Sequence, residues 1–195
     1  MRVPRGLPLA LMTLLLPPTL PGQQPIGIAE VERVLGPLVE AYGVSGTEGP
    51  VRDQVIADLP AWAQAQTDTA GNLWVKVGNG DPLVVIVAHL DEIGFRVAGL
   101  QEDGQLLLES RGGFFSSLYE AEPALVHTPT GIVPGVFPPR DSVVTRRSPG
   151  ALRVDLGTSS RSATEALGIA VGATVTSPKQ YVRLAGTRAT GRSFD

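Results

Sequence analysis

A run of six apolar residues, Leu83 to Ala88, is followed at once by His89 and then by Asp91 and Glu92. Six consecutive apolar residues are typical of a strand that is buried on both faces of a parallel or mixed sheet. In such α/β sheets, ligands collect at the carboxyl ends of the strands. The hydrophilic residues after this run are therefore the first place to look for chemistry.

Composition restricts both the fold and the chemistry. The chain has 23 Gly and 17 Pro among 195 residues, which favours short strands joined by turns over a helical bundle. Its net charge of -3 gives no basic surface for nucleic acid, so a nucleic-acid partner is not expected. The absence of Cys excludes disulfides, a thiol nucleophile and thiolate zinc sites, so a metal would need His and carboxylate ligands.

Residues 1–25 have the layout of a secretory signal peptide. Arg2 and Arg5 are their only charges, and the apolar run from Leu7 to Leu16 is followed by several prolines. A helix needs about 20 apolar residues to span a bilayer, so a stable membrane span is not expected. We expect export to the periplasm or the extracellular space, or a cytoplasmic location if this segment is not a working signal.

Two helices are predicted next. Apolar residues recur at helical spacing over 28–42, although Pro37 should kink or shorten that helix. Ser45 and Glu48 are three residues apart before a second apolar pattern, which predicts a capping box and a helix that Pro60 ends. Helices followed by a buried strand indicate an α/β layer.

The pattern changes after about residue 98 to short segments separated by Gly or Pro, which is typical of a small barrel or sandwich. A brief helix is expected before Gly168, with Ser162 and Glu165 at capping-box spacing. The strands expected outside the central run are Asn72–Val77, Gln105–Glu109, Ala124–Thr128, Ile132–Phe137, Leu152–Leu156, Ala173–Thr176 and Tyr181–Leu184. This later region is predicted to be an inserted β module.

His89 and Asp91 are two residues apart, so in extended backbone their side chains point to the same side. A neutral imidazole there can bind a metal while the carboxylate orients it or handles protons. Alternatively, His89 caps the end of the strand and Asp91 begins a solvated loop. The spacing alone leaves both interpretations open.

Several ordered segments together resemble one family. They are Val44–Glu48 with Val51 and Arg52, Asp68–Asn72, Ala88–Phe95, Gly131–Val136, Val154–Gly157, Ala166–Ile169 and Arg192–Asp195. Their order and spacing resemble the glutamyl and deblocking aminopeptidases, which are dinuclear metallopeptidases. This family includes the self-compartmentalising tetrahedral aminopeptidases, and some members are labelled endoglucanases. The resemblance runs from about residue 30 to the last residue.

The resemblance implies an α/β fold, namely part of a zinc-peptidase domain with an inserted small β-barrel-like domain that makes subunit contacts. The implied division has four parts. They are a signal peptide at 1–25, peptidase domain at 26–98, the inserted dimerisation domain at 99–187, and a return into the peptidase domain at 188–195. A homo-oligomer through the insertion is expected.

The resemblance also implies roles for three residues. His89 would ligate one metal, Asp91 would orient that ligand as a catalytic support, and Asp195 would bridge two divalent metals, zinc or cobalt. Two bridged cations activate a shared water and polarise the scissile carbonyl of a peptide substrate. The family's general-base Glu pair, a further acidic ligand and a distal His all follow the bridging aspartate. We therefore expect an amino-terminal half, truncated and inactive alone, that holds zinc poorly because catalytic zinc sites use three protein ligands.

Three hypotheses follow. The first is a metal-dependent aminopeptidase, and the second is a non-enzymatic, exported interaction or dimerisation module derived from one. The third is a glycosidase, which would need two carboxylic acids beside a sugar-binding cleft. Chelation should abolish the peptidase activity and spare a carboxylate-pair glycosidase.

Other residues with chemistry-bearing side chains are expected to have structural roles. Ser45 has no His at a recognisable partner position, so we assign it to the helix cap and not to a nucleophile. The role of Glu92 stays open, since its charge could tune a neighbouring metal. Structural, turn or packing roles are expected for His127, Asp141, Asp155, Trp62 and Trp74.

Overall fold

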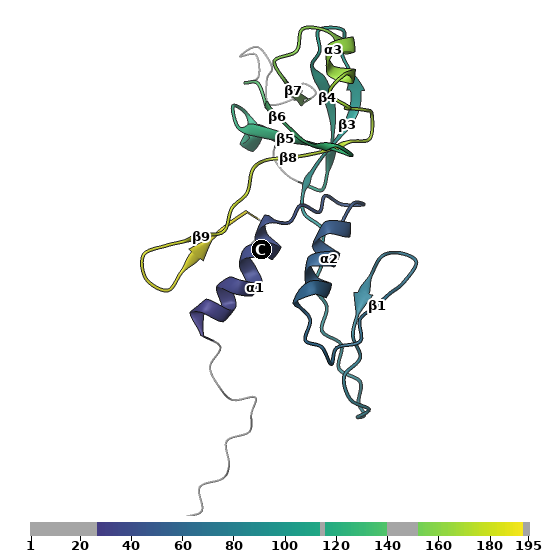
Figure 1. Cartoon of the computed structure of the whole chain (residues 1–195), viewed down its shortest axis with the longest axis vertical. Helices are drawn as coiled ribbons and strands as arrows, with labels where there is room; N and C mark the ends of the chain where they lie inside the picture. The colour runs from purple at the N-terminus through teal and green to yellow at the C-terminus, as the bar shows by residue number, and fades with distance from the viewer. Residues whose placement is uncertain (1–26, 114–115, 140–151, 193–195) are drawn as a thin grey trace, which may run out of the picture.

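The computed structural model describes residues 27–113, 116–139 and 152–192. Two helices and a short hairpin form the first part and lie together on one side of the main sheet (Figure 1). Arg52 of the second helix contacts the hairpin, because its guanidinium donates to the carbonyl of Gly71 in the hairpin turn at 3.2 Å. These elements are α1 (Ile28–Glu40), α2 (Gly49–Asp58), β1 (Gln66–Thr67) and β2 (Leu73–Trp74).

A six-stranded antiparallel sheet forms the second part, with the order β6-β5-β8-β3-β4-β7. The sheet curls until its two edges meet, because Val136 and Asp155 exchange two backbone hydrogen bonds of 2.9 Å. This curled sheet confirms the predicted barrel-like module within an α/β fold. Its strands are β3 (Gly94–Leu100), β4 (Leu106–Arg111), β5 (Pro123–Thr128), β6 (Gly131–Val136), β7 (Arg153–Val154) and β8 (Thr174–Thr176).

The hydrophobic core lies inside this curled sheet. Phe95, Tyr119 and Phe137 pack ring against ring at its centre, with centroids 4.8 to 5.5 Å apart. A short turn of helix, η1 (Ser116–Tyr119), supplies the tyrosine. The core cluster also contains Val97, Leu100, Leu106, Leu108, Ala124, Val126, Leu152, Val154, Ile169 and Val175.

A short helix, α3 (Arg161–Glu165), closes one end of the sheet. The hydroxyl of Thr164, a fully buried residue, donates to the carbonyl of Gly104 at 2.7 Å. Ser160 is the N-cap, and its hydroxyl accepts from the amide of Ala163. The predicted helix is therefore present, but its cap is Ser160 and not Ser162.

The two predicted amino-terminal helices are confirmed, with Pro37 inside α1. The capping box is wrong, because Glu48 is the N-cap of α2 and makes no side-chain cap hydrogen bond. The Glu48 carboxylate accepts instead from the amide of Gly46, and the hydroxyl of Ser45 points to Asp91. A contact that is distant in sequence has replaced the local one.

The predicted central strand Leu83–Ala88 is also wrong for the described chain. No strand is assigned there, and Leu83 and Ile86 are 75% and 94% exposed. A strand buried on both faces needs neighbours along both edges, and no segment of the described ranges pairs with this one. Similarly, the strand expected over Asn72–Val77 is limited to Leu73–Trp74.

A last hairpin, β9 (Val182–Arg183) with β10 (Ala189–Thr190), returns the chain to α1 (Figure 1). The Arg183 guanidinium lies 3.4 Å from the Glu32 carboxylate of that helix. Within the three described ranges, no helix has the length and apolar character to cross a bilayer. The predicted signal peptide, residues 1–25, lies outside the described residues.

Candidate metal-binding site

His89 and Asp91 lie between the exposed apolar run and the first residue of β3. The Nδ1 atom of His89 is 3.2 Å from Asp91 Oδ1 and 2.9 Å from the backbone oxygen of Asp91. Their side chains are 63% and 41% exposed. The structure therefore brings the two residues together as the spacing predicts, at a position that solvent reaches.

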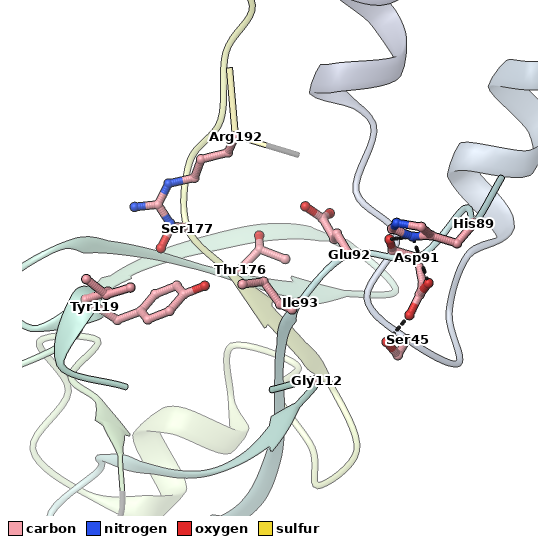
Figure 2. A pocket seen from close by; sticks show the side chains of 11 residues that line it. Ser45, His89, Asp91, Glu92, Ile93, Gly112, Tyr119, Thr176, Ser177 and Arg192 are labelled. Atoms are coloured by element: carbon pink, nitrogen blue, oxygen red, sulfur yellow. Dashed lines mark hydrogen bonds and ion pairs between the residues drawn. The ribbon is translucent and has the colours of Figure 1, made fainter. Parts of the chain in front are cut away.

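Ser45 reaches the same carboxylate from the loop between α1 and α2. Its hydroxyl donates to Asp91 Oδ2, so each carboxylate oxygen has its own partner (Figure 2). The hydrogen bond from Ser45 and the charge of His89 both lower the pKa of Asp91. Asp91 is therefore an ionised hydrogen-bond acceptor at neutral pH.

Glu92 points into a buried ion pair. Its Oε1 accepts from Lys179 Nζ at 2.7 Å and from the amide of Gly43 at 2.9 Å. The side chains of Lys179 and Glu92 are only 3% and 14% exposed, and the Lys179 ammonium also lies 4.9 Å from the ring centroid of Tyr42. Glu92 thus joins the loop after α1 to the segment that follows β8.

A pocket of about 470 Å³ extends from His89 and Asp91 across to Tyr119 and Arg192 (Figure 2). The Arg192 guanidinium lies 5.4 Å from the Tyr119 ring centroid and 3.9 Å from the Glu122 carboxylate. Burial raises the pKa of Tyr119, so its hydroxyl stays protonated at neutral pH. The pocket therefore has a carboxylate and an imidazole on one wall and a cation over an aromatic ring on the other.

The His89–Asp91 pair fits one ligand position of a metal centre. A carboxylate on one ring nitrogen is the arrangement that orients histidine ligands of zinc. No group of three His, Cys, Asp or Glu that could hold a metal occurs among the described residues. Asp195, the predicted bridging ligand, lies outside them, so its position relative to His89 is not described.

Two other residues with chemistry-bearing side chains, His127 and Asp155, do not line this pocket. His127 Nε2 lies 2.8 Å from Thr176 Oγ1, and its ring is 4.8 Å from that of Tyr42, which agrees with the structural role expected. Asp155 forms a turn by accepting from the amide of Gly157 at 2.7 Å.

Both tryptophans were expected to pack, but Trp62 and Trp74 are 66% and 47% exposed in the described chain. Asp141 lies outside the described residues.

The sequence interpretation missed the roles of Ser45 and Lys179. The Ser45 hydroxyl had a local explanation in the capping box, and nothing near Lys179 in the sequence marks it as the partner of Glu92.

The sequence profile of the M42 glutamyl aminopeptidases matches residues 71–195. The chain belongs to this family. It is 32% identical over 149 residues to the glutamyl aminopeptidase of Lactococcus lactis subsp. cremoris (strain MG1363), covering 69% of this chain and 42% of that protein. The chain spans less than half of the length of the curated relatives it matches, for example 48%, 42% and 42% of three of them.

Solved structures of this family share the fold. The TET1 peptidase of Pyrococcus horikoshii, which assembles into a tetrahedron or a large octahedral shell, superposes with a TM-score of 0.69 at 27% identity. The match covers 82% of this chain and 49% of that one. A Thermotoga maritima protein described as an endoglucanase gives a TM-score of 0.66 at 30% identity, covering 83% and 49% of the two chains.

Proposed function

We propose that this chain contributes to a metal-dependent aminopeptidase, which hydrolyses amino-terminal residues from peptides. The observation that carries this proposal is the His89–Asp91 pair on the wall of the pocket, in a chain of the M42 family. In this proposal His89 binds one metal through Nε2, and Asp91 holds the ring in place through Nδ1. The opposite wall, with Arg192 and Tyr119, would receive part of the peptide.

Two divalent cations, zinc or cobalt, would supply activation of a water and polarisation of the scissile carbonyl when bound. The chain's own contribution would be one oriented imidazole, to which Asp195 would add a carboxylate ligand. The described residues bring one histidine and one carboxylate together, whereas a catalytic zinc normally has three protein ligands. The chain alone should therefore bind zinc weakly and should not turn over peptides.

Hydrolysis of glutamyl, leucyl and lysyl 4-nitroanilides with added Zn²⁺ or Co²⁺ tests this proposal. We expect no turnover by the 195-residue chain alone. Where the source reading frame continues past the Asp195 codon, we expect chelator-sensitive turnover by the longer chain. His89→Ala should abolish the second activity, and His127→Ala is the matched control. Activity that survives both chelation and His89→Ala would refute the proposal, because such activity needs neither the metal nor its histidine ligand.

A second candidate function is a non-enzymatic, exported module for interaction or dimerisation. The curled sheet favours it, because the core cluster lies wholly between residues 95 and 175 and includes no residue of α1 or α2. Apolar side chains on its outside, including Leu118 and Val171 at 65% and 64% exposure, would then meet a second copy. Self-association of the 195-residue chain without metal, together with no peptidase activity when Zn²⁺ or Co²⁺ is added, would support this candidate over the first.

A further inference from the structure

The carboxylate of Asp91 is held from both sides. Ser45 donates to Oδ2, and Oδ1 lies 3.2 Å from His89 Nδ1. A carboxylate with only one partner can rotate about its terminal torsion, which has a broad energy profile. With both oxygens engaged, the plane of this carboxylate is fixed toward the imidazole (Figure 2).

The position of Ser45 does not depend on its hydroxyl. The Ser45 amide donates to the carbonyl of Glu92 at 3.3 Å, and the Glu92 amide donates to the carbonyl of Gly43 at 2.8 Å. Between them, Val44 is 2% exposed and pairs with Glu92 in a parallel bridge. Loss of the hydroxyl alone should therefore leave the loop in place and release only the carboxylate.

The orientation of Asp91 decides which ring nitrogen of His89 carries the proton. A carboxylate oxygen can only accept, so the Nδ1 that faces it must be the protonated nitrogen of a neutral imidazole. The lone pair is then on Nε2, and this neutral tautomer can bind a metal through that nitrogen. We infer that Ser45 is a positioning residue that fixes the tautomer and ring orientation of His89 through the carboxylate of Asp91. This inference rests on the proposed function only for its consequence, the binding of metal.

A competing arrangement is present at the same nitrogen. The backbone oxygen of Asp91 lies 2.9 Å from His89 Nδ1, closer than the carboxylate. If this carbonyl alone held the ring, Ser45 would have no influence on His89. The experiment must therefore separate the carbonyl from the carboxylate.

Nitrogen NMR of the imidazoles does so without any metal. The chain has only two histidines, so labelling with ¹⁵N-histidine gives two ring systems, and His127 serves as the internal reference. In the full chain at a pH where both rings are neutral, we expect the Nδ1–H tautomer for His89. Ser45→Ala should shift His89 toward the mixed tautomers of an unconstrained ring, Ser45→Thr should restore it, and Ser160→Ala should leave it unchanged.

Unchanged His89 signals in Ser45→Ala would overturn the inference and assign the ring to the backbone carbonyl. The ring of His127 contacts Tyr42, close to this loop, so movement of both histidines would report that the loop itself had changed. A comparison of Ser45→Thr with Ser45→Val then separates loss of the hydroxyl from a change in the loop, because the two side chains have nearly the same shape. Only the threonine should keep the wild-type His89 signals, and equal signals in the pair would again overturn the inference.

Titration with zinc chloride separates this inference from the proposed function. We expect zinc to shift the His89 Nε2 signal, with a dissociation constant about tenfold higher in Ser45→Ala, at the low end for loss of a group that supports a metal ligand. If zinc left His89 unshifted in the wild-type chain, the metal-ligand role in the proposed function would fail. The inference about the His89 tautomer would not be affected, because the tautomer is measured without metal.

Discussion

Lys179→Met should destabilise the fold more than most single substitutions. It removes the cation from a 2.7 Å ion pair whose two side chains are 3% and 14% exposed, and leaves the Glu92 carboxylate in a site with little water. Breaking a buried pair by removing one partner costs about 3–5 kcal/mol, because the charge that stays is not compensated. The amide of Gly43 still donates to Glu92, which places the expected loss near 3 kcal/mol.

Urea unfolding followed by tryptophan fluorescence or circular dichroism would measure this loss. A change of that size should lower Tm by about 6–12 °C in a chain of this length. In the double variant Glu92→Leu with Lys179→Met no charge is left behind, so most of the stability should return. Lys179→Met could cost less than about 1 kcal/mol, or the losses of Glu92→Leu and Lys179→Met could simply add in the double variant. Either result would show that Glu92 and Lys179 do not form a stabilising buried ion pair.

Two further predictions concern His127 and a glycine of β3. Burial lowers the pKa of His127, so the unfolded chain takes up a proton near pH 6.5 that the folded chain resists. Stability is therefore highest above that pH and falls as the pH drops toward the folded value. Urea midpoints between pH 5 and 8 should show this slope, and His127→Gln should remove it.

Gly94→Ala places a Cβ 2.6 Å from Val44 Cγ2 and should cost about 1–3 kcal/mol in thermal unfolding. Gly99→Ala, whose nearest neighbour outside the adjacent residues is 3.8 Å away, is the matched control in the same strand. Equal losses in the two variants would contradict the contact.

The sequence predicted elements whose stability is local. The helix over Ile28–Glu40 and the strands β5 and β6 agree closely with their periodicity and their bounding turns. The longest strand, β3, was missed, although Phe95 and Val97 alternate inward as a strand requires. A bulge between Val97 and Gly99 breaks that alternation, and the glycines at 94 and 99 indicate turns when seen without their neighbours.

The predictions that were wrong concern residues whose structure depends on partners far along the chain. The apolar run at 83–88 has the composition of a buried strand, but whether it is buried depends on strands beside it, which no local pattern specifies. Ser45 matched a capping box equally well before its distant contact with Asp91 was known. For the site, the spacing of His89 and Asp91 was enough to predict their contact, whereas Ser45 and Lys179 required the three-dimensional arrangement.

The confinement of the core to the curled sheet divides the chain into parts of unequal local stability. Helix α2 contains no buried residue and α1 contains one, Val39, so the amides of these helices should exchange with solvent long before those of β3 and β5. His89 and Asp91 lie at the boundary between the two parts. Each local opening of α1 and α2 would pull Ser45 away from Asp91. The fraction of time for which the His89 imidazole is oriented therefore depends on the local unfolding equilibrium of these two helices.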